Sequence, residues 1–293
     1  MRVRFISFRD VIATGVPADA DCLFLYGLPG TAWSGGAIWE DERLAQAIGA
    51  FVQGGGGLVG LQAPSALDDR WALSDLFGVT GAGEVADAGP MAAYSGDEWI
   101  DEAALAQARE VGGAALALAT PVSGLEQPSA IAGMTATVSA RPVAEDLTVA
   151  YALVGAGETA TPGMTVREVG QGRAVWLAGW SAEYGFSRLL RSAIFVAAQR
   201  EGQATRLDVT GGDGLFVYAW PEARIIALVS EAEQPIEATV RCDPVILVMP
   251  VLFPGPVTDV VTGERLGTVA QLSDGLTVTA IPHCMRLLRL GGE

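Results

Sequence analysis

The sequence predicts an α/β fold with a parallel sheet, followed by a small all-β sandwich. Up to about Arg200, short apolar runs alternate with helical patterns, and several runs are apolar at consecutive positions, as in strands covered on both faces. After about Gly202, short alternating runs are separated by turns, several of them glycine-containing, which is typical of a β-sandwich. The chain has 293 residues, half of them apolar, enough to bury two cores. We therefore expect an α/β domain over 1–201 and a β-sandwich over 202–293.

In the first domain, one helix is expected between the second and third strand-like runs. The segment Asp41–Val52 places its apolar residues on one helical face. Its acidic start suits the positive end of a helix dipole, and Gly54 supplies a C-terminal stop. The segment Phe186–Gln199 repeats this apolar spacing and predicts a second helix. The predicted strands of this domain are Val3–Phe8, Cys22–Tyr26, Gly57–Leu61 and Ala174–Ala178.

Two regions complete the organisation of the chain. Between about Gly81 and Ser139 the sequence is rich in Ala and Gly and less periodic, which predicts an insertion of helices and loops, with Asp101–Val111 as a candidate helix. The second domain is expected to consist of short strands. These are Leu215–Trp220, Arg224–Val229, Ala238–Arg241, Val245–Val248, Thr258–Val261, Leu276–Ala280 and Cys284–Leu290.

The composition excludes several classes of function. The net charge of −16 repels nucleic acid and anionic lipid, so neither nucleic acid nor a membrane is expected as a partner. No apolar stretch is long enough to span a bilayer and no export signal is visible, so we expect a cytoplasmic protein. Three widely spaced cysteines, Cys22, Cys242 and Cys284, fit a reducing compartment and are expected to be buried core thiols.

Catalytic and cofactor signals are weak. The chain has no lysine and a single histidine, His283, which removes phosphate-loop lysines, Schiff bases and most acid–base pairs. The run Gly54–Gly57 precedes a strand, whereas a dinucleotide fingerprint follows one, so we expect no cofactor. No His, Cys or carboxylate cluster has metal-ligand spacing, so no metal is expected. Ser65 follows a strand, where a hydrolase holds its nucleophile, but the Gly-x-Ser-x-Gly frame is absent.

The most informative segment is a glycine-rich loop that carries tryptophan. It runs Gly30-Thr31-Ala32-Trp33-Ser34-Gly35-Gly36, with Trp39 close behind, between a strand-like run and a helix. Loops at the carboxyl ends of strands gather ligand and partner contacts in α/β sheets. Trp180 lies in a second glycine-flanked loop after a strand. A partner- or sugar-facing surface is therefore expected at these loops, with domain packing favoured over ligand stacking for Trp33. Its candidate residues are Thr31, Trp33, Ser34, Trp39 and Trp180.

These residues resemble the 1,3-β-galactosyl-N-acetylhexosamine phosphorylases, also called lacto-N-biose or galacto-N-biose phosphorylases. The resemblance resumes in the second half of the α/β domain and continues through the terminal strands. Its segments are Gly30–Gly36 with Trp39, Phe51–Gly56, Ala63–Ser65, Leu73–Val79, Ala178–Trp180 and Ser187–Ile194.

The resemblance implies a modular enzyme. In that family an N-terminal TIM barrel cleaves β1,3-linked galactosyl-N-acetylhexosamines with phosphate, giving galactose 1-phosphate. This chain resembles the two domains behind the barrel, a class I glutamine-amidotransferase-like (flavodoxin-like) α/β domain and a β-sandwich. No catalytic residue is therefore carried over, and the chain is expected to be inactive alone. Met1–Phe8 resembles the second strand of the α/β domain, which would leave one sheet position open.

Three hypotheses follow. In the first, the chain is a non-catalytic part of a carbohydrate phosphorylase that packs against its TIM barrel or forms a homo-oligomer. The second is a free-standing sugar-binding or oligomerisation module, with a galactosyl-N-acetylhexosamine as ligand. The third is a residual hydrolase that uses Ser65.

Overall fold

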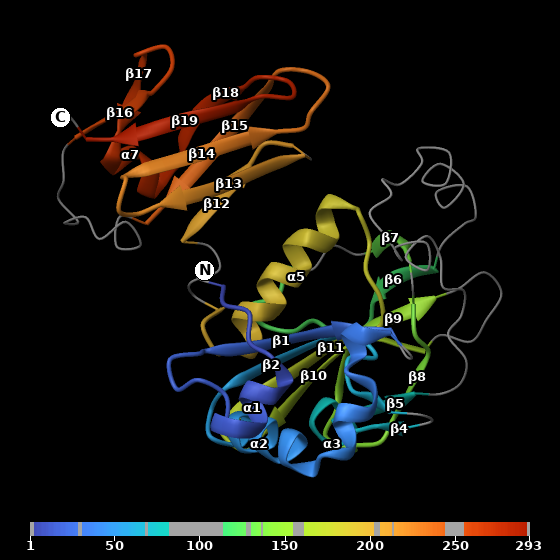
Figure 1. Ribbon diagram of the computed structural model, residues 1–293. Helices are drawn as coiled ribbons and strands as arrows, with labels where there is room; N and C mark the ends of the chain where they lie inside the picture. Colours follow the sequence, from blue (N-terminus) through green and yellow to red (C-terminus); the bar gives the residue numbers. More distant parts are fainter. Residues whose placement is uncertain are drawn as a thin grey trace. The chain divides into compact units, whose positions relative to one another are not determined.

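The computed structural model describes two units, and each is treated by itself (Figure 1). The first unit spans Met1–Glu201 and the second Gly202–Glu293. The described residues are 3–28, 31–67, 70–81, 114–126, 130–135, 137–154, 161–201, 206–212, 214–243 and 255–291. The predicted helix Asp101–Val111 and the predicted strand Val245–Val248 lie outside them.

The first unit contains a seven-stranded sheet with helices on both faces (Figure 1). A Cβ built on Gly57 would meet the backbone of Ala197 in the last helix, and one built on Gly60 would meet the ring of Phe77. These two glycines of β2, three residues apart, thus lie against helices on opposite faces of the sheet. The helices are α1 (Phe8–Thr14), α2 (Glu42–Gln53), α3 (Ser74–Phe77) and α5 (Tyr184–Ala197), with 3-10 turns η1 (Ala32–Ser34) and η2 (Gly36–Glu40).

The strand order of this sheet is β1-β2-β11-β10-β9-β6-β7. Short pairs β3–β4 and β5–β8 lie outside it. The bounds are β1 (Cys22–Gly27), β2 (Gly57–Gln62), β3 (Ala66–Leu67), β4 (Arg70–Trp71), β5 (Val79–Gly81), β6 (Ala114–Leu118), β7 (Ala130–Met134), β8 (Ala140–Pro142), β9 (Thr148–Val154), β10 (Thr161–Val169) and β11 (Gly172–Leu177).

The sheet is mixed rather than parallel throughout. Strands β1, β2 and β11 are parallel, whereas β11, β10, β9, β6 and β7 pair antiparallel. The change of direction has a local cause: β10 and β11 are joined by Gly170 and Gln171 alone, and Gly170 has φ 62°. A two-residue turn of this kind makes a hairpin, which is antiparallel by construction. The amidotransferase-like assignment stays a prediction.

Two predicted elements of this unit are wrong. Residues 3–7 form no strand, because Ser7 and Asp10 make a capping box that starts α1 at Phe8. In the predicted helical insertion, the described segments Ala114–Leu118 and Ala130–Met134 are strands β6 and β7. By contrast, the predicted strands at β1, β2 and β11 and the predicted helices at α2 and α5 are confirmed within a few residues at their ends.

The second unit contains two sheets that share one apolar core. One has the order β12-β15-β18 and the other β13-β14-β19-β16-β17, and core side chains such as Val240 and Leu288 come from both. The described predicted strands of this unit are confirmed within a residue or two at their ends, except that the predicted strand Thr258–Val261 ends at Asp259, with Val260 and Val261 in the turn that follows. Its elements are β12 (Leu207–Thr210), β13 (Leu215–Trp220), β14 (Ile225–Ser230), β15 (Ile236–Cys242), β16 (Pro256–Asp259), β17 (Arg265–Thr268), α7 (Val269–Asp274), β18 (Leu276–Ala280) and β19 (Met285–Leu290).

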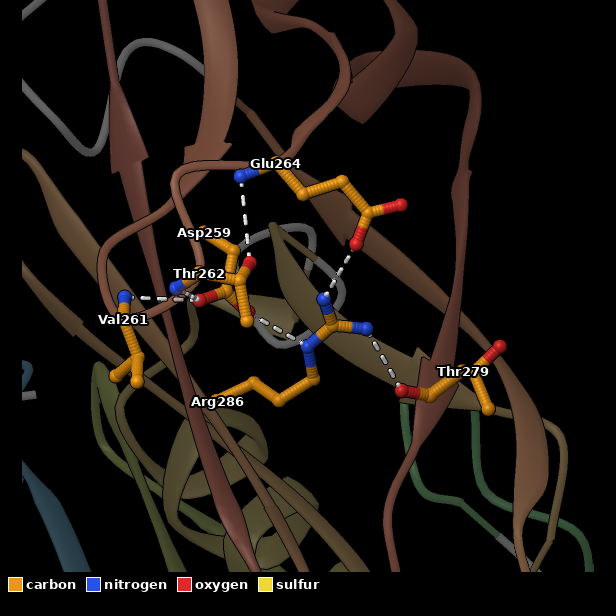
Figure 2. A network of polar contacts seen from close by, with 6 residues as sticks. All are labelled: Asp259, Val261, Thr262, Glu264, Thr279 and Arg286. Carbon is orange, nitrogen blue, oxygen red and sulfur yellow. Dashed lines mark hydrogen bonds and ion pairs between the residues drawn. The ribbon is translucent and has the colours of Figure 1, made fainter.

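A buried ion pair links β16 and β19, neighbouring strands of the five-stranded sheet (Figure 2). Arg286 Nε donates to Asp259 Oδ2 at 2.8 Å, and Arg286 Nη1 donates to the carbonyl oxygen of Thr279 on β18 at 3.0 Å. The other carboxylate oxygen of Asp259 accepts from the backbone N–H groups of Val261 and Thr262, both at 2.9 Å. Burial raises the pKa of Asp259, but these N–H groups and Arg286 outweigh it, so the net pKa is lowered. The ionised pair therefore anchors the β16–β17 turn to the core.

Candidate functional site

The loops that carry the predicted site residues leave the parallel part of the sheet. Strands β1, β2 and β11 run in the same direction, with Gly27 paired to Gln62 and Leu61 paired to Leu177. Their carboxyl ends therefore lie along one edge, from which η1 and η2 follow β1 and Trp180 follows β11. This is the edge where α/β sheets place ligand and partner loops.

Trp39 and Ser34 form the internal support of the first loop. The indole of Trp39 is 2 % exposed, packs against the ring of Phe8 at 5.3 Å between centroids, and donates from Nε1 to the carbonyl oxygen of Ser34 at 2.5 Å. Ser34 is fully buried, and its Oγ donates to the carbonyl oxygen of Thr31 at 2.8 Å. Thr31 is half-buried, and its Oγ1 donates to the carbonyl oxygen of Leu28 at 2.7 Å. Ser34 and Trp39 are therefore buried supports, and the hydroxyl of Thr31 bonds within the loop.

Two glycines, Gly27 at the end of β1 and Gly35 in the loop, are explained by packing. A Cβ on Gly27 would lie 2.4 Å from the backbone nitrogen of Ser34, so η1 sits directly against the end of β1. Gly35 has φ 89°, and a Cβ there would meet Trp39 Nε1 at 2.7 Å and the Phe8 ring at 2.9 Å. Only glycine avoids both the strained backbone and these clashes. Gly35 thus allows the close fit around Trp39, and Gly27 allows η1 to lie against β1.

Trp33 is the residue that this loop presents outward. It is 65 % exposed, and its ring stacks on Tyr26 of β1, with centroids 5.6 Å apart and planes 29° apart. Phe24 lies two residues before Tyr26 and therefore on the same face of β1, and it is 40 % exposed. We call Phe24, Tyr26 and Trp33 the aromatic cluster. The loop sequence pointed to Trp33. Phe24 and Tyr26 could have been found from the two-residue period of a strand, which places both aromatic side chains on one face of β1.

Trp180 occupies a different position from Trp33. Its backbone pairs with Thr135, whose N–H donates to the Trp180 carbonyl oxygen at 2.7 Å. Its side chain is half-buried, and Nε1 is buried without a hydrogen-bond partner. Among the ring contacts of the described residues, none joins Trp180 to the aromatic cluster. Trp33 and Trp180 were predicted to share one surface, but the described ring contacts do not bring them together.

The residues considered for catalysis have structural surroundings. Ser65 is fully buried, and its Oγ accepts a hydrogen bond from the backbone N–H of Leu73 at 3.2 Å. His283 belongs to the second unit, where its side chain is 61 % exposed and lies 3.5 Å from Glu233. A buried serine hydroxyl that holds a backbone turn is not accessible to a substrate. The described surroundings of Ser65 therefore do not favour the hydrolase hypothesis.

Two of the three cysteines are unreactive, and the described residues offer no metal-binding group. Burial raises the pKa of Cys22 and of Cys242 to about 12, with smaller contributions from Asp21 and Asp243 respectively. Such thiols stay protonated and unreactive at neutral pH. Cys284 is exposed, so the expectation of a buried thiol is wrong there, because it lies in the turn before β19 rather than in the strand. Within the described ranges, no group of three His, Cys, Asp or Glu side chains is placed to hold a metal ion.

One further finding concerns membranes. None of the helices in the described part of the chain combines the length and apolar character needed to cross a bilayer.

The comparisons show which family the first unit resembles. The family model described as the lacto-N-biose phosphorylase central domain matches residues 1–202. The 1,3-β-galactosyl-N-acetylhexosamine phosphorylase of Bifidobacterium longum subsp. longum is 26% identical over 268 residues, covering 82% of this chain and 33% of that protein. The D-galactosyl-β-1→4-L-rhamnose phosphorylase of Lachnoclostridium phytofermentans is 29% identical over 199 residues, covering 67% of this chain and 23% of that protein. This chain thus spans about a third or less of the length of these relatives.

Solved structures add a likeness in fold. The β-galactosidase from Bacillus circulans sp. alkalophilus matches with a TM-score of 0.50 and 13% sequence identity, covering 91% of this chain and 32% of that one. At this identity the match concerns the fold alone.

Proposed function

Because this chain belongs to the family of the lacto-N-biose phosphorylase central domain, we propose that it is a non-catalytic accessory part of a carbohydrate phosphorylase. In this proposal, the complete enzyme converts a β1,3-galactosyl-N-acetylhexosamine and phosphate to galactose 1-phosphate. The Bifidobacterium longum relative is named as a phosphorylase of such a disaccharide. In the same proposal, residues 1–201 form an amidotransferase-like α/β domain and residues 202–293 form a β-sandwich. The parallel group β1-β2-β11 and the shared core of the second unit support this division.

The role proposed for the chain is to pack against a catalytic barrel. The described sheets contain one parallel group of only three strands, so a barrel of eight parallel strands is not among them. The observation that carries the role is the aromatic cluster. Trp33 is exposed but held by its stack on Tyr26 and by the buried Ser34–Trp39 contact behind it. A rigid exposed indole is the kind of anchor that fills a pocket in a partner surface.

The test is the size and activity of the native polypeptide, isolated from its source cells with an antibody against this chain. We expect an intact mass well above 30.3 kDa, and phosphorolysis of lacto-N-biose by that species but not by the isolated 293-residue chain. A native 30.3 kDa species that phosphorolyses lacto-N-biose would overturn the non-catalytic role. A native 30.3 kDa species without activity would overturn the segment role and favour a free-standing module.

The contact itself is tested with a matched pair of substitutions in the native polypeptide. Trp33→Ala removes the exposed indole, and Val143→Ala removes a 45 % exposed side chain elsewhere in the same unit. We expect faster limited proteolysis between the accessory part and the barrel in Trp33→Ala only. Equal proteolysis rates in both variants and the unsubstituted protein would contradict docking through Trp33.

The exposure of Trp33 also favours a second function, namely sugar binding or self-association by a free-standing module. Saturable binding of lacto-N-biose by the isolated chain, lost in Trp33→Ala, would support the sugar-binding form. A concentration-dependent dimer, lost in the same variant, would support the oligomerisation form.

A further inference from the structure

The second unit has an apolar outer sheet face that the phosphorylase role does not use. In β13, the side chains of Leu215, Val217 and Ala219 belong to the core or pack against it. Phe216, Tyr218 and Trp220 alternate with them and therefore lie on the opposite, outer face. Tyr218 is 52 % exposed and Trp220 is 50 % exposed.

The neighbouring strands extend this face (Figure 1). Strand β14 places Ile225, Ala227 and Val229 opposite Trp220, Tyr218 and Phe216, and β19 places Arg289, Leu287 and Met285 next to them. Met285 is 54 % exposed. We call these outward positions the apolar face. Its members are Phe216, Tyr218, Trp220, Ile225, Ala227, Val229, Met285, Leu287 and Arg289.

The composition of the apolar face is unusual for this chain. Antiparallel sheets with one face toward water normally alternate apolar inward and polar outward residues. Here Arg289 is the only charged residue among the outward positions of β13, β14 and β19, although the chain carries 34 acidic residues. Tyr218, Trp220 and Met285 are about half exposed, whereas Ala227 between them is fully buried. Exposed apolar side chains grouped on one surface often mark an interaction site.

The size of the apolar face favours a small occupant. Three strands about 4.8 Å apart, with outward positions over some 20 Å of strand, cover roughly 300 Å². A stable protein–protein interface needs about 800 Å² on each partner. A second copy of this chain, with its net charge of −16, would also bring like charges together around the patch. On its own the face is smaller than the area that a stable dimer buries on each partner, and it suits a flat, uncharged ligand.

We propose that the apolar face binds a neutral oligosaccharide, with a sugar ring stacked on Trp220 and a second on Tyr218. The C–H groups of a pyranose face are apolar and fit flat aromatic rings, while its hydroxyl groups stay in water or meet polar side chains. Trp220 is followed across the sheet by Ile225, Arg289 and Thr258. The guanidinium of Arg289 supplies hydrogen-bond donors for hydroxyl groups beside the stacked ring. This binding is independent of the accessory role proposed for the first unit.

The test is calorimetric titration of the full chain with three neutral sugars: lacto-N-biose, β1,4-galactotriose and cellotriose. We expect saturable binding of at least one, weakened roughly tenfold or more by Trp220→Ala. Trp220→Phe retains a ring, so its loss of affinity is expected to be smaller. Val261→Ala is the matched control, because Val261 is 78 % exposed in the turn after β16 and outside the apolar face. Its affinity should equal that of the unsubstituted chain.

Three results would overturn the proposal. The first is that none of the three sugars binds. The second is binding that Trp220→Ala and Tyr218→Ala leave unchanged while circular dichroism shows both variants folded. The third is a concentration-dependent dimer in sedimentation that Trp220→Ala dissociates, because the face would then be an interface between copies. None of these results bears on the mass or phosphorolysis expected for the native polypeptide.

Discussion

The η1–η2 loop of the first unit and the β16–β17 turn of the second are held in place by different forces. In the loop, a neutral bond from Trp39 to the Ser34 carbonyl and the packing of Trp39 on Phe8 support an exposed Trp33. In the turn, a buried carboxylate, Asp259, is satisfied by two backbone N–H groups and by Arg286. Loss of a neutral partner removes a bond and some packing, whereas loss of a charged partner leaves a buried charge uncompensated. The two regions should therefore differ in their tolerance of substitution.

The largest effect is expected for Arg286→Met. The side chains of Arg286 and Asp259 are 11% and 3% exposed, so the substitution leaves an unpaired buried carboxylate. We expect the second unit to lose about 3–5 kcal/mol of unfolding free energy, measured by urea denaturation. The control is Arg289→Met on the same strand, whose exposed side chain should change stability by less than about 0.5 kcal/mol. Equal midpoints for the two variants would show that the ion pair does not anchor the turn.

The double variant Asp259→Asn/Arg286→Met sharpens this result. Removing both charges avoids the unpaired carboxylate, so we expect the double variant to be more stable than Arg286→Met alone. If the double variant is the less stable of the two, hydrogen bonding rather than charge pairing dominates at this turn.

A smaller loss is expected for Trp39→Phe in the first unit. Phenylalanine keeps an aromatic ring against Phe8 but cannot donate to the carbonyl oxygen of Ser34. The lost bond and the smaller ring should cost roughly 1–3 kcal/mol, read from the denaturation of the first unit. A substitution without effect would mean that the Ser34–Trp39 contact does not support the loop.

The pH dependence of stability separates the two regions further. The pKa of Asp259 is lowered on folding, so its contribution to stability is fully present above the ordinary value of 3.8 and is lost as pH falls through the lower folded value. We expect the stability of the second unit to fall below about pH 4. This fall should be shallower in Asp259→Asn, as measured by urea denaturation from pH 6 to pH 3. Identical slopes in both proteins would contradict the assignment.

The smallest effect on stability is expected for Trp33→Ala. Because Trp33 is mostly exposed, its removal should change the unfolding free energy by less than about 0.5 kcal/mol. Thermal unfolding of this variant beside Trp39→Phe gives the comparison within one loop. A loss of unfolding free energy as large as that of Trp39→Phe would mean that the stack of Trp33 on Tyr26 stabilises the loop.

Elements whose evidence is periodic could be predicted from the sequence. The consecutive apolar residues of β1, β2 and β11 and the apolar faces of α2 and α5 were sufficient signals. The segment before α1 was predicted wrongly. Its apolar alternation suggests a strand, but the capping box of Ser7 and Asp10 starts a helix there instead. Strands β6 and β7 were missed because their Ala- and Gly-rich sequences carry little apolar alternation.

The site was predictable only in part, because contacts between segments distant in sequence decide which of its side chains are exposed. Trp33 lies within the glycine-rich segment and Trp39 follows it, and their sequence surroundings do not show which is buried. Trp39 is buried because Phe8 of α1 and the Ser34 carbonyl surround it, and Trp33 is exposed on Tyr26 of β1. The pairing of Asp259 with Arg286 likewise depends on strands β16 and β19 lying side by side.

The internal position of β11 in the sheet limits the order in which the first unit can fold. Strand β11 pairs with β2 on one side and β10 on the other, yet it follows both in the chain. A nascent chain emerging from the ribosome can pair β1 with β2 early, but the edge of β2 stays open until Leu177 has been made. Pairings so distant in sequence close slowly, because the entropy of a long loop is lost before the contacts form. Synthesis of this unit thus includes an interval in which an apolar strand edge is exposed, when chaperone binding would protect it from aggregation.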